Sequence, residues 1–172
     1  MGVHTPQDIL VSLILGFFIV LLVNKIIESI SVRDDAELIL AVTAFAGFVI
    51  MLLITIFRVF PDIYYDGQIL EVGRQMQRDL MTMGGALLGF SLGFLCDHFF
   101  VHHEGADSKL FNIVITVVGL ILVFVIKKLT QPFFEDIGYV YGHALLQTIL
   151  VFFIVALWPW ACRLLQRKFL KY

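Results

Sequence analysis

The sequence predicts an all-α integral membrane protein with five transmembrane helices. Hydrophobic residues make up 60% of the 172 positions, and the mean hydropathy is +0.94, whereas a soluble domain is closer to half apolar. The apolar residues lie in blocks of about 20 positions, the length that a helix needs to cross a bilayer. Only helices and closed barrels satisfy backbone groups in lipid, and these blocks are too long for barrel strands.

The five predicted spans follow one another with short connections. The first block carries polar groups only near its far end, at Asn24, Lys25 and Glu28. The fourth block is the shortest. The blocks cover residues 8–30, 36–57, 79–99, 110–126 and 144–164.

The longest connection, residues 58–78, contains residues that break regular structure. Pro61 and Gly67 interrupt it, and Tyr64 and Tyr65 are typical of a membrane–water interface. We expect an irregular, amphipathic segment along the outer membrane surface. An ordinary connecting loop is the alternative.

Charge predicts the orientation of the chain in the membrane. An odd number of spans places the termini on opposite sides, and the positive-inside rule places a basic tail in the cytoplasm. The N-terminus then faces the periplasm, the exterior or an organelle lumen. Trp158 and Trp160 fit an aromatic belt beside the tail, and Pro159 between them predicts a kink. The basic residues of the tail are Arg163, Arg167, Lys168 and Lys171.

Composition also argues against two classes of protein. The formal net charge is −2, so no basic field indicates nucleic-acid binding. The two cysteines, Cys96 and Cys162, lie in or beside apolar blocks. They are interpreted as small buried hydrophobic residues, with no disulfide framework or metal motif.

Glycine recurs at every fourth position of the third block, at Gly85, Gly89 and Gly93. Small residues at this spacing lie on one helix face and let a neighbouring helix approach closely in lipid. The pattern predicts packing within the chain, with a dimer contact through the same face as the alternative.

Two polar clusters are candidate sites. Asp97, His98, His102, His103 and Glu104 include a His pair at i, i+4 that could hold one ion. We favour an interfacial polar cap there and predict no metal site.

The second polar cluster lies on the predicted outer side. Glu135, Asp136, Tyr139 and His143 either border a pocket for a lipid headgroup or are solvated loop residues.

The N-terminal stretch is the strongest candidate for chemistry. Thr5 and Asp8 fit a capping box, with Pro6 at the first helical position. The same helix start would hold His4 within reach of Asp8. A carboxylate on one imidazole nitrogen fixes the tautomer and leaves the other nitrogen free to attack phosphorus.

Gly-Val-His-Thr-Pro-Gln-Asp-Ile-Leu at residues 2–10, before an apolar helix with Gly16, resembles the end of the third motif of the type 2 phosphatidic acid phosphatase family. That motif reads Ser-Arg, five residues, His, three residues, Asp. His4 and Asp8 match its last two elements. The resemblance implies that His4 is the catalytic nucleophile and that Asp8 orients it.

The rest of the chain is similar to bacterial members with extra C-terminal helices and to sphingosine-phosphate phosphatases. The similarity rests on the glycine-rich residues 84–94, the polar loop with Gly105, and Trp-Pro-Trp at residues 158–160. It implies part of a helical bundle like that of phosphatidic acid phosphatases and vanadium haloperoxidases. Residues 1–59 would supply the last two helices of the catalytic core, residues 60–78 an outer interfacial connector, and residues 79–172 three accessory helices and the tail.

The resemblance implies hydrolysis of a lipid phosphomonoester or pyrophosphate through a phosphohistidine, without a metal or cofactor. The candidate substrates are phosphatidic acid, phosphatidylglycerol phosphate, undecaprenyl pyrophosphate and a sphingoid phosphate. The other partners that we expect are the bilayer and, in the alternative for the glycine face, a second copy of the chain.

The sequence also departs from the family pattern. The Lys and Arg of the first motif, the Pro-Ser-Gly-His of the second and the Ser-Arg of the third do not occur. We therefore expect the C-terminal portion of an enzyme, from a shortened gene model or a split gene, nearly inactive alone. The alternative is a non-catalytic assembly or scaffold subunit in which His4 and Asp8 belong only to a helix cap.

Overall fold

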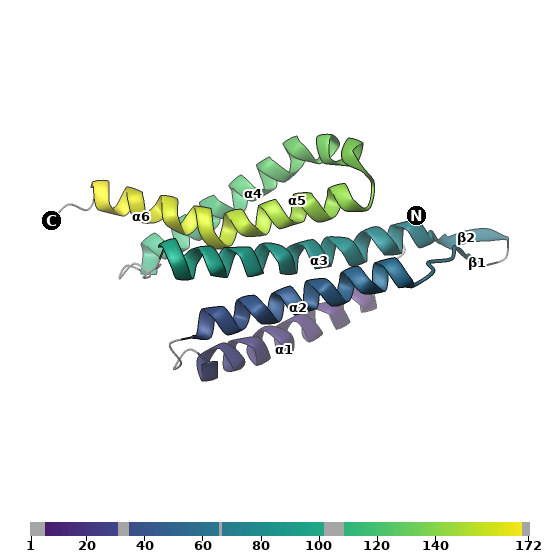
Figure 1. The fold of residues 1–172 in the computed structure, drawn as a ribbon, viewed down its shortest axis with the longest axis horizontal. Helices are drawn as coiled ribbons and strands as arrows, with labels where there is room; N and C mark the ends of the chain where they lie inside the picture. Colours follow the sequence, from purple (N-terminus) through teal and green to yellow (C-terminus); the bar gives the residue numbers. More distant parts are fainter. Residues whose placement is uncertain (1–5, 31–34, 66, 102–108, 170–172) are drawn as a thin grey trace. The chain divides into compact units, whose positions relative to one another are not determined.

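A computed structural model describes residues 6–30, 35–65, 67–101 and 109–169. The chain divides into two compact units, Met1–Ala36 and Glu37–Tyr172. The elements, labelled in Figure 1, are α1 (Pro6–Ile30), α2 (Ala36–Phe57), β1 (Ile63–Tyr65), β2 (Gln68–Glu71), α3 (Gly73–Cys96), the π-helical η1 (Asp97–Val101), α4 (Lys109–Ile137), α5 (Tyr141–Phe152), the π-helical η2 (Phe153–Leu157) and α6 (Trp158–Phe169).

The first unit contains the single helix α1, which begins at Pro6. Proline suits the first helical position because its φ is already helical and its missing N–H would have no partner there. The helix has 25 residues, a length of about 37 Å at 1.5 Å per residue, which exceeds the hydrocarbon thickness of a bilayer. It coincides with the first predicted block.

The second unit holds four described helical stretches that are long and apolar enough to cross a membrane. The all-α membrane fold predicted from the sequence is thereby confirmed. Only 6% of the most apolar window of the third stretch is buried within the chain, so its surface suits lipid or another helix as a neighbour. The stretches are Leu38–Phe57, Gly73–Phe100, Ile113–Ile137 and Tyr141–Leu164.

The fourth predicted block, residues 110–126, is shorter than the helix that the structure shows there. The helix α4 continues beyond residue 126 through Lys127, Lys128 and Pro132 to Ile137. Lysine is a good helix former, so charge ends an apolar run without ending the helix. Similarly, α3 begins at Gly73, six residues before the predicted block.

Part of the connection between α2 and α3 folds as a hairpin. Strand β1 pairs antiparallel with β2, Tyr64 opposite Ile69 and Tyr65 opposite Gln68. Gly67 has φ of 75°, a left-handed conformation that glycine adopts without steric cost. The sequence prediction of an irregular segment missed these strands.

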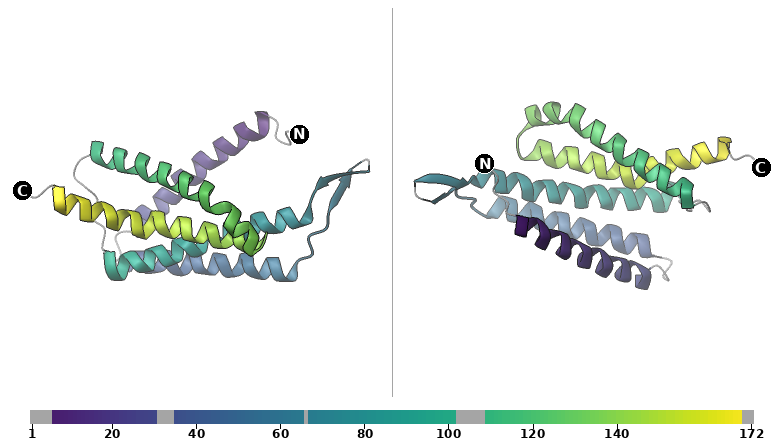
Figure 2. Two further views of the ribbon diagram at one scale, coloured as in Figure 1. Left: turned by 90° about the horizontal axis from the view of Figure 1, so that it is seen from above. Right: turned by 180° about the vertical axis from the view of Figure 1, so that it is seen from behind.

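Helix α5 lies between α3 and α4 (Figures 1 and 2). One apolar cluster joins α3 to α5 and the preceding turn through Met81, Val140 and Ala144. Another joins α4 to α5 through Phe134, Leu146 and Leu150, all buried. Helix α2 packs on α3, because a Cβ at Gly84 would contact the side chains of Met51 and Phe48.

The glycine face of α3 is covered by α5 and η2 within the chain. A Cβ at Gly85 would overlap the backbone of Ala144, and one at Gly89 would lie 2.6 Å from the Thr148 carbonyl oxygen. A Cβ at Gly93 would lie 2.6 Å from the side chain of Val155. The close approach of these helices therefore depends on the missing side chains.

The helix widens to a π-helix immediately before Pro159. The N–H of Trp158 donates to the carbonyl oxygen of Phe153, five residues earlier. Proline has no N–H to bond the carbonyl four residues before it, and its ring clashes with that group. A wider turn relieves the clash.

Candidate functional site

The structure describes only part of the predicted catalytic pair, His4 and Asp8. His4 lies outside the described residues, and Asp8 lies in the first turns of α1 with its side chain outside them. Helix α1 begins at Pro6, the residue predicted for the first helical position. The roles of His4 and Asp8 therefore stay predictions.

A cluster of arginine and tyrosine side chains lies at the start of α3. Arg74 and Arg78 are one helical turn apart and share a face. Both guanidinium groups lie over the ring of Tyr139, which precedes α5, at 5.7 Å and 5.1 Å from its centroid. The ring of Tyr139 therefore contacts two cationic side chains from one face of α3.

The hydrogen bonds of Arg78 hold the cluster together. Its Nη1 donates to the Tyr139 hydroxyl oxygen over 2.7 Å, while Nε and Nη2 donate to Oδ1 of Asp79 over 2.8 Å and 2.7 Å. Arg78 thus links α3 to the turn between α4 and α5, and Asp79 balances its charge. The Tyr139 oxygen accepts this bond, so its own proton is available to an acceptor.

The N-terminus of α3 is fixed by a side chain from the preceding connection. Oδ1 of Asp62 accepts the backbone N–H of Gly73 over 2.8 Å, which satisfies one of the N–H groups that a helix start leaves without a partner. A Cβ at Gly73 would overlap the carbonyl of Phe60. This contact sets the position from which Arg74 and Arg78 project.

An open pocket of about 320 Å³ lies beside the cluster, lined by Val72, Arg74, Gln75 and Tyr139. Arg74 is exposed there, and its contact with the Tyr139 ring is the one interaction recorded for its side chain among the described residues. The five N–H donors of Arg74 point to the solvent and the pocket, and no carboxylate of the described residues accepts from them.

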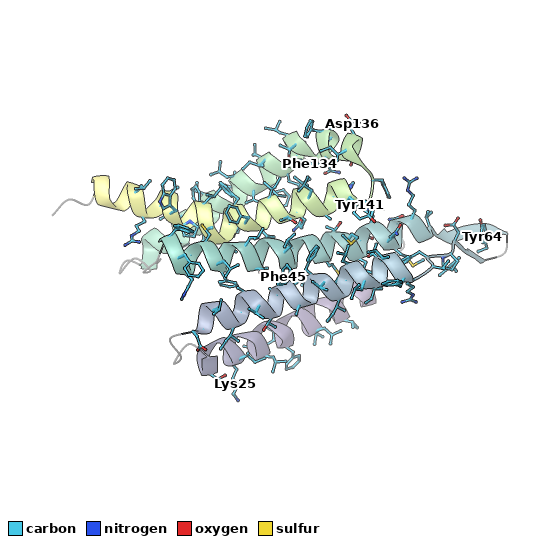
Figure 3. The ribbon with its side chains drawn as sticks, in the orientation of Figure 1. Lys25, Phe45, Tyr64, Phe134, Asp136 and Tyr141 are labelled. Atoms are coloured by element: carbon cyan, nitrogen blue, oxygen red, sulfur yellow. The ribbon has the colours of Figure 1, made fainter. Side chains whose placement is uncertain are left out.

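The sequence predicted part of this site. Glu135, Asp136, Tyr139 and His143 were candidates to border a headgroup pocket, and Tyr139 lines one. His143 instead bonds the Tyr139 carbonyl oxygen through Nδ1 at 2.8 Å, with Nε2 3.6 Å from Oε1 of Glu135. Asp136 is exposed near the end of α4 (Figure 3).

Arg74 and Arg78 were missed as members of the site. Their spacing of four residues just before the predicted span 79–99 was the available signal. The partner, Tyr139, lies 61 residues from Arg78 along the chain, and no local pattern indicates so distant a contact.

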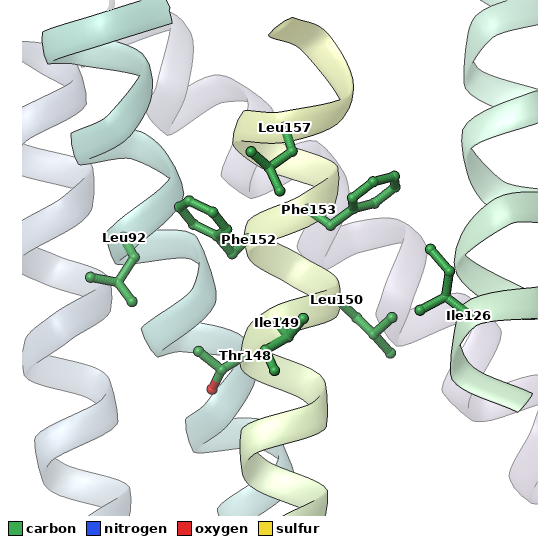
Figure 4. Close-up of a pocket in the computed structure, with 8 residues that line it drawn as sticks. All are labelled: Leu92, Ile126, Thr148, Ile149, Leu150, Phe152, Phe153 and Leu157. Atoms are coloured by element: carbon green, nitrogen blue, oxygen red, sulfur yellow. The ribbon is translucent and has the colours of Figure 1, made fainter. Parts of the chain in front are cut away.

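A second cleft, of about 310 Å³, is apolar (Figure 4). Ile126 of α4 faces Leu150 and Phe153 across it, and Leu92 comes from α3. The hydroxyl of Thr148 in the lining already donates to backbone carbonyls. This cleft can hold hydrocarbon, and the described residues of its lining offer no group for acid–base or nucleophilic chemistry.

Among the described residues, no three His, Cys, Asp or Glu side chains are placed to hold a metal ion. Three members of the polar cluster that begins at Asp97, namely His102, His103 and Glu104, lie outside those residues. Cys96 and Cys162 are free thiols, Cys162 buried.

The chain matches no curated protein and no solved structure. Residues 81–168, just over half of the chain, match the model of one family, described as PAP2 superfamily phosphatase, transmembrane extension. The match runs from Met81 in α3 through α4 and α5 into α6, and it confirms the family resemblance drawn from the sequence. With four apolar helices long enough to span a bilayer, the chain is an integral membrane protein that belongs to the PAP2 superfamily of phosphatases.

Proposed function

We propose that this protein takes part in hydrolysing a lipid phosphomonoester or pyrophosphate, with His4 as the nucleophile. The observation that carries the proposal is the family match over residues 81–168 together with His4 and Asp8 at the spacing of the family's third motif. The start of α1 at Pro6 supports it, because Asp8 then lies in the first turn and close in sequence to His4.

In the proposed reaction, Asp8 accepts a hydrogen bond from one imidazole nitrogen of His4, and the other nitrogen attacks phosphorus. The bond from phosphorus to the leaving oxygen breaks, and that oxygen takes a proton from a general acid. Water then attacks the phosphohistidine, which releases inorganic phosphate and restores the imidazole.

The reaction also needs groups that the family supplies from its other motifs. Catalysis of phosphoryl transfer depends on cations around the phosphate oxygens, and the corresponding Lys, Arg and His motifs do not occur in this sequence. We propose that these residues come from polypeptide beyond the 172 residues, and that this segment alone hydrolyses its substrate very slowly.

The test is an assay of phosphate release by the full open reading frame of the gene in detergent micelles. The four lipid phosphates named above are each supplied as substrate. We expect His4→Ala to lower kcat by about 10³-fold or more, because no nucleophile remains. Gln7→Ala, at a variable spacer position of the motif in the first turn of α1, is the matched control and should keep full activity.

Equal activity of His4→Ala and the unchanged protein would defeat the catalytic proposal. The non-catalytic alternative, an assembly or scaffold subunit in which the His4–Asp8 segment only starts a helix, would then replace it.

For orientation, we propose an outward or lumenal N-terminus and a cytoplasmic C-terminus in a bacterial inner membrane or an organelle membrane. The basic residues after Trp160 support this orientation through the positive-inside rule. A reporter enzyme that is active only outside the cytoplasm, fused after Tyr172, should be inactive. An active fusion would reverse the orientation.

A further inference from the structure

We propose that Arg74, Arg78 and Tyr139 form a binding site for a phosphate group carried by a lipid headgroup. The site lies in the pocket at the start of α3, outside the His4–Asp8 motif. It requires neither of those residues, so it is independent of the proposed hydrolytic role of His4.

The topology places the site at a membrane–water boundary. Arg74 and Arg78 lie in the first two turns of the span Gly73–Phe100, and Tyr139 lies between the spans Ile113–Ile137 and Tyr141–Leu164. The start of one span and the turn between the next two fall on the same side of a bilayer. Figure 3 shows the labelled Tyr141 at the end of the bundle where α3 begins.

The side chains offer the donors that a phosphate requires. Arginine presents a planar fork of N–H groups that matches two phosphate oxygens, and Arg74 makes no recorded hydrogen bond or ion pair among the described residues. The Tyr139 hydroxyl accepts from Arg78, so its proton can be donated to a third oxygen.

The local charge also favours an anion. Asp79 balances Arg78, and its side chain is about half exposed, whereas the charge of Arg74 has no recorded counterion in the described part of the chain. The partial positive charge of the helix start is already met by the Asp62 carboxylate at Gly73, so the arginine side chains provide the charge for an anion. Arg78 is left with two N–H groups, one on each terminal nitrogen, that neither Asp79 nor Tyr139 accepts.

The pocket has the size and lining of a headgroup site. Its volume of about 320 Å³ is at the lower end of the range for small-molecule pockets, roughly 300–1,000 Å³. Val72, exposed on its wall, offers an apolar surface beside the polar groups. This combination suits a phosphate attached to a glycerol or a similar backbone.

The test is calorimetric titration of the full chain in a neutral detergent. The probes are a short-chain phosphonate analogue of phosphatidic acid, which resists hydrolysis, inorganic phosphate, and short-chain phosphatidylcholine. We expect the phosphonate lipid to bind more tightly than inorganic phosphate, and phosphatidylcholine to bind weakly because choline cancels its charge.

Variants at the site should weaken binding of the phosphonate lipid. Arg74→Gln should raise Kd about tenfold or more, because a charged donor pair is lost. Tyr139→Phe keeps the ring under both arginines and should raise Kd about fivefold through the lost hydroxyl. Arg58→Gln is the matched control: it removes the same charge from an exposed arginine that lies over Phe60, and it should leave Kd unchanged.

Thermal unfolding of each variant in the same detergent identifies any that fails to fold, and Arg74→Lys then replaces Arg74→Gln. Equal weakening by Arg58→Gln and Arg74→Gln would overturn the proposal, since binding would then follow net charge alone. No effect of Arg74→Gln and Tyr139→Phe would also overturn it. Equal affinity for inorganic phosphate and the phosphonate lipid, both weakened by Arg74→Gln, would support the site with free phosphate as its ligand.

Discussion

The hydroxyl of Thr148 on α5 donates to the carbonyl oxygen of Gly85 on α3 over 2.9 Å, and the two residues are 63 positions apart. The same hydroxyl lies 2.9 Å from the carbonyl oxygen of Ala144 in its own helix. Thr148 is buried, and a Cβ at Gly85 would overlap Ala144. A polar bond and a tight backbone approach therefore coincide at one crossing point of the bundle.

Replacing Thr148 by Val should destabilise the protein by about 1 kcal/mol, because an interhelical hydrogen bond in a membrane protein contributes about that much. Valine keeps the shape of the side chain, so packing is nearly unchanged. Thermal unfolding in detergent measures the effect. Thr130→Val is the control, since among the described residues Thr130 donates to the Ile126 carbonyl oxygen of its own helix; an equal loss in both variants would contradict an interhelical role.

Replacing Gly85 by Ala should cost about 1–3 kcal/mol, because the new methyl group meets the rigid backbone of α5 and the helices must separate. The matched variant is Gly47→Ala on α2, where the methyl would meet the tip of the flexible Leu87 side chain at 2.9 Å. That tip can turn away, so a smaller loss is expected. Unfolding in detergent at the same lipid content distinguishes the two, and equal losses would refute the explanation.

Replacing Gly67 by Ala should loosen the hairpin between β1 and β2. The left-handed φ of 75° at Gly67 costs an alanine about 1 kcal/mol, and this small sheet has only two strands to offset that cost. Hydrogen exchange of the amides in 63–71 should speed up by about fivefold. Gly67→Asn, which tolerates this conformation, should exchange more slowly than Gly67→Ala; the opposite order would show that the turn is not the cause.

Replacing Arg78 by Gln should free the turn between α4 and α5. Arg78 donates to the Tyr139 hydroxyl over 2.7 Å, and its loss should cost about 1 kcal/mol. Hydrogen exchange over residues 138–143 reports the loosening. Arg58→Gln carries the same charge change at an exposed position and should leave that exchange unchanged. If both variants speed it equally, the contact with Tyr139 does not hold the turn.

The sequence predicted the helices because membrane spans are recorded in block length and composition, which need no tertiary information. It placed the end of α4 incorrectly, since Lys127 and Lys128 mark where the apolar surface ends rather than where the backbone stops being helical. The hairpin had a local signal, Asp66-Gly67, a pair preferred in two-residue loops. Gly67 acts here as a turn residue between two paired strands, which its tendency to interrupt regular structure does not indicate by itself.

The candidate site was harder to predict for a physical reason. Tyr139 was singled out, but Arg78 and Tyr139 meet only because α5 folds back along α3. Gly85 indicated that some helix approaches that face, without indicating which one. His4 was proposed from its spacing to Asp8 and from the family motif, and it lies outside the described residues.

The π-helical segment before Pro159 determines which side chains the last helix presents to its neighbour. A π turn accommodates one more residue than an α turn, so everything after it is rotated by about 100° relative to an uninterrupted α-helix. With the rotation that the π-helical segment gives to α6, the indole N–H of Trp158 donates to the Ile115 carbonyl oxygen over 3.3 Å, and Cys162 is buried. In a homologue that lacks one residue in this stretch, the tryptophan that corresponds to Trp158 would point in a different direction, even if every other residue were the same.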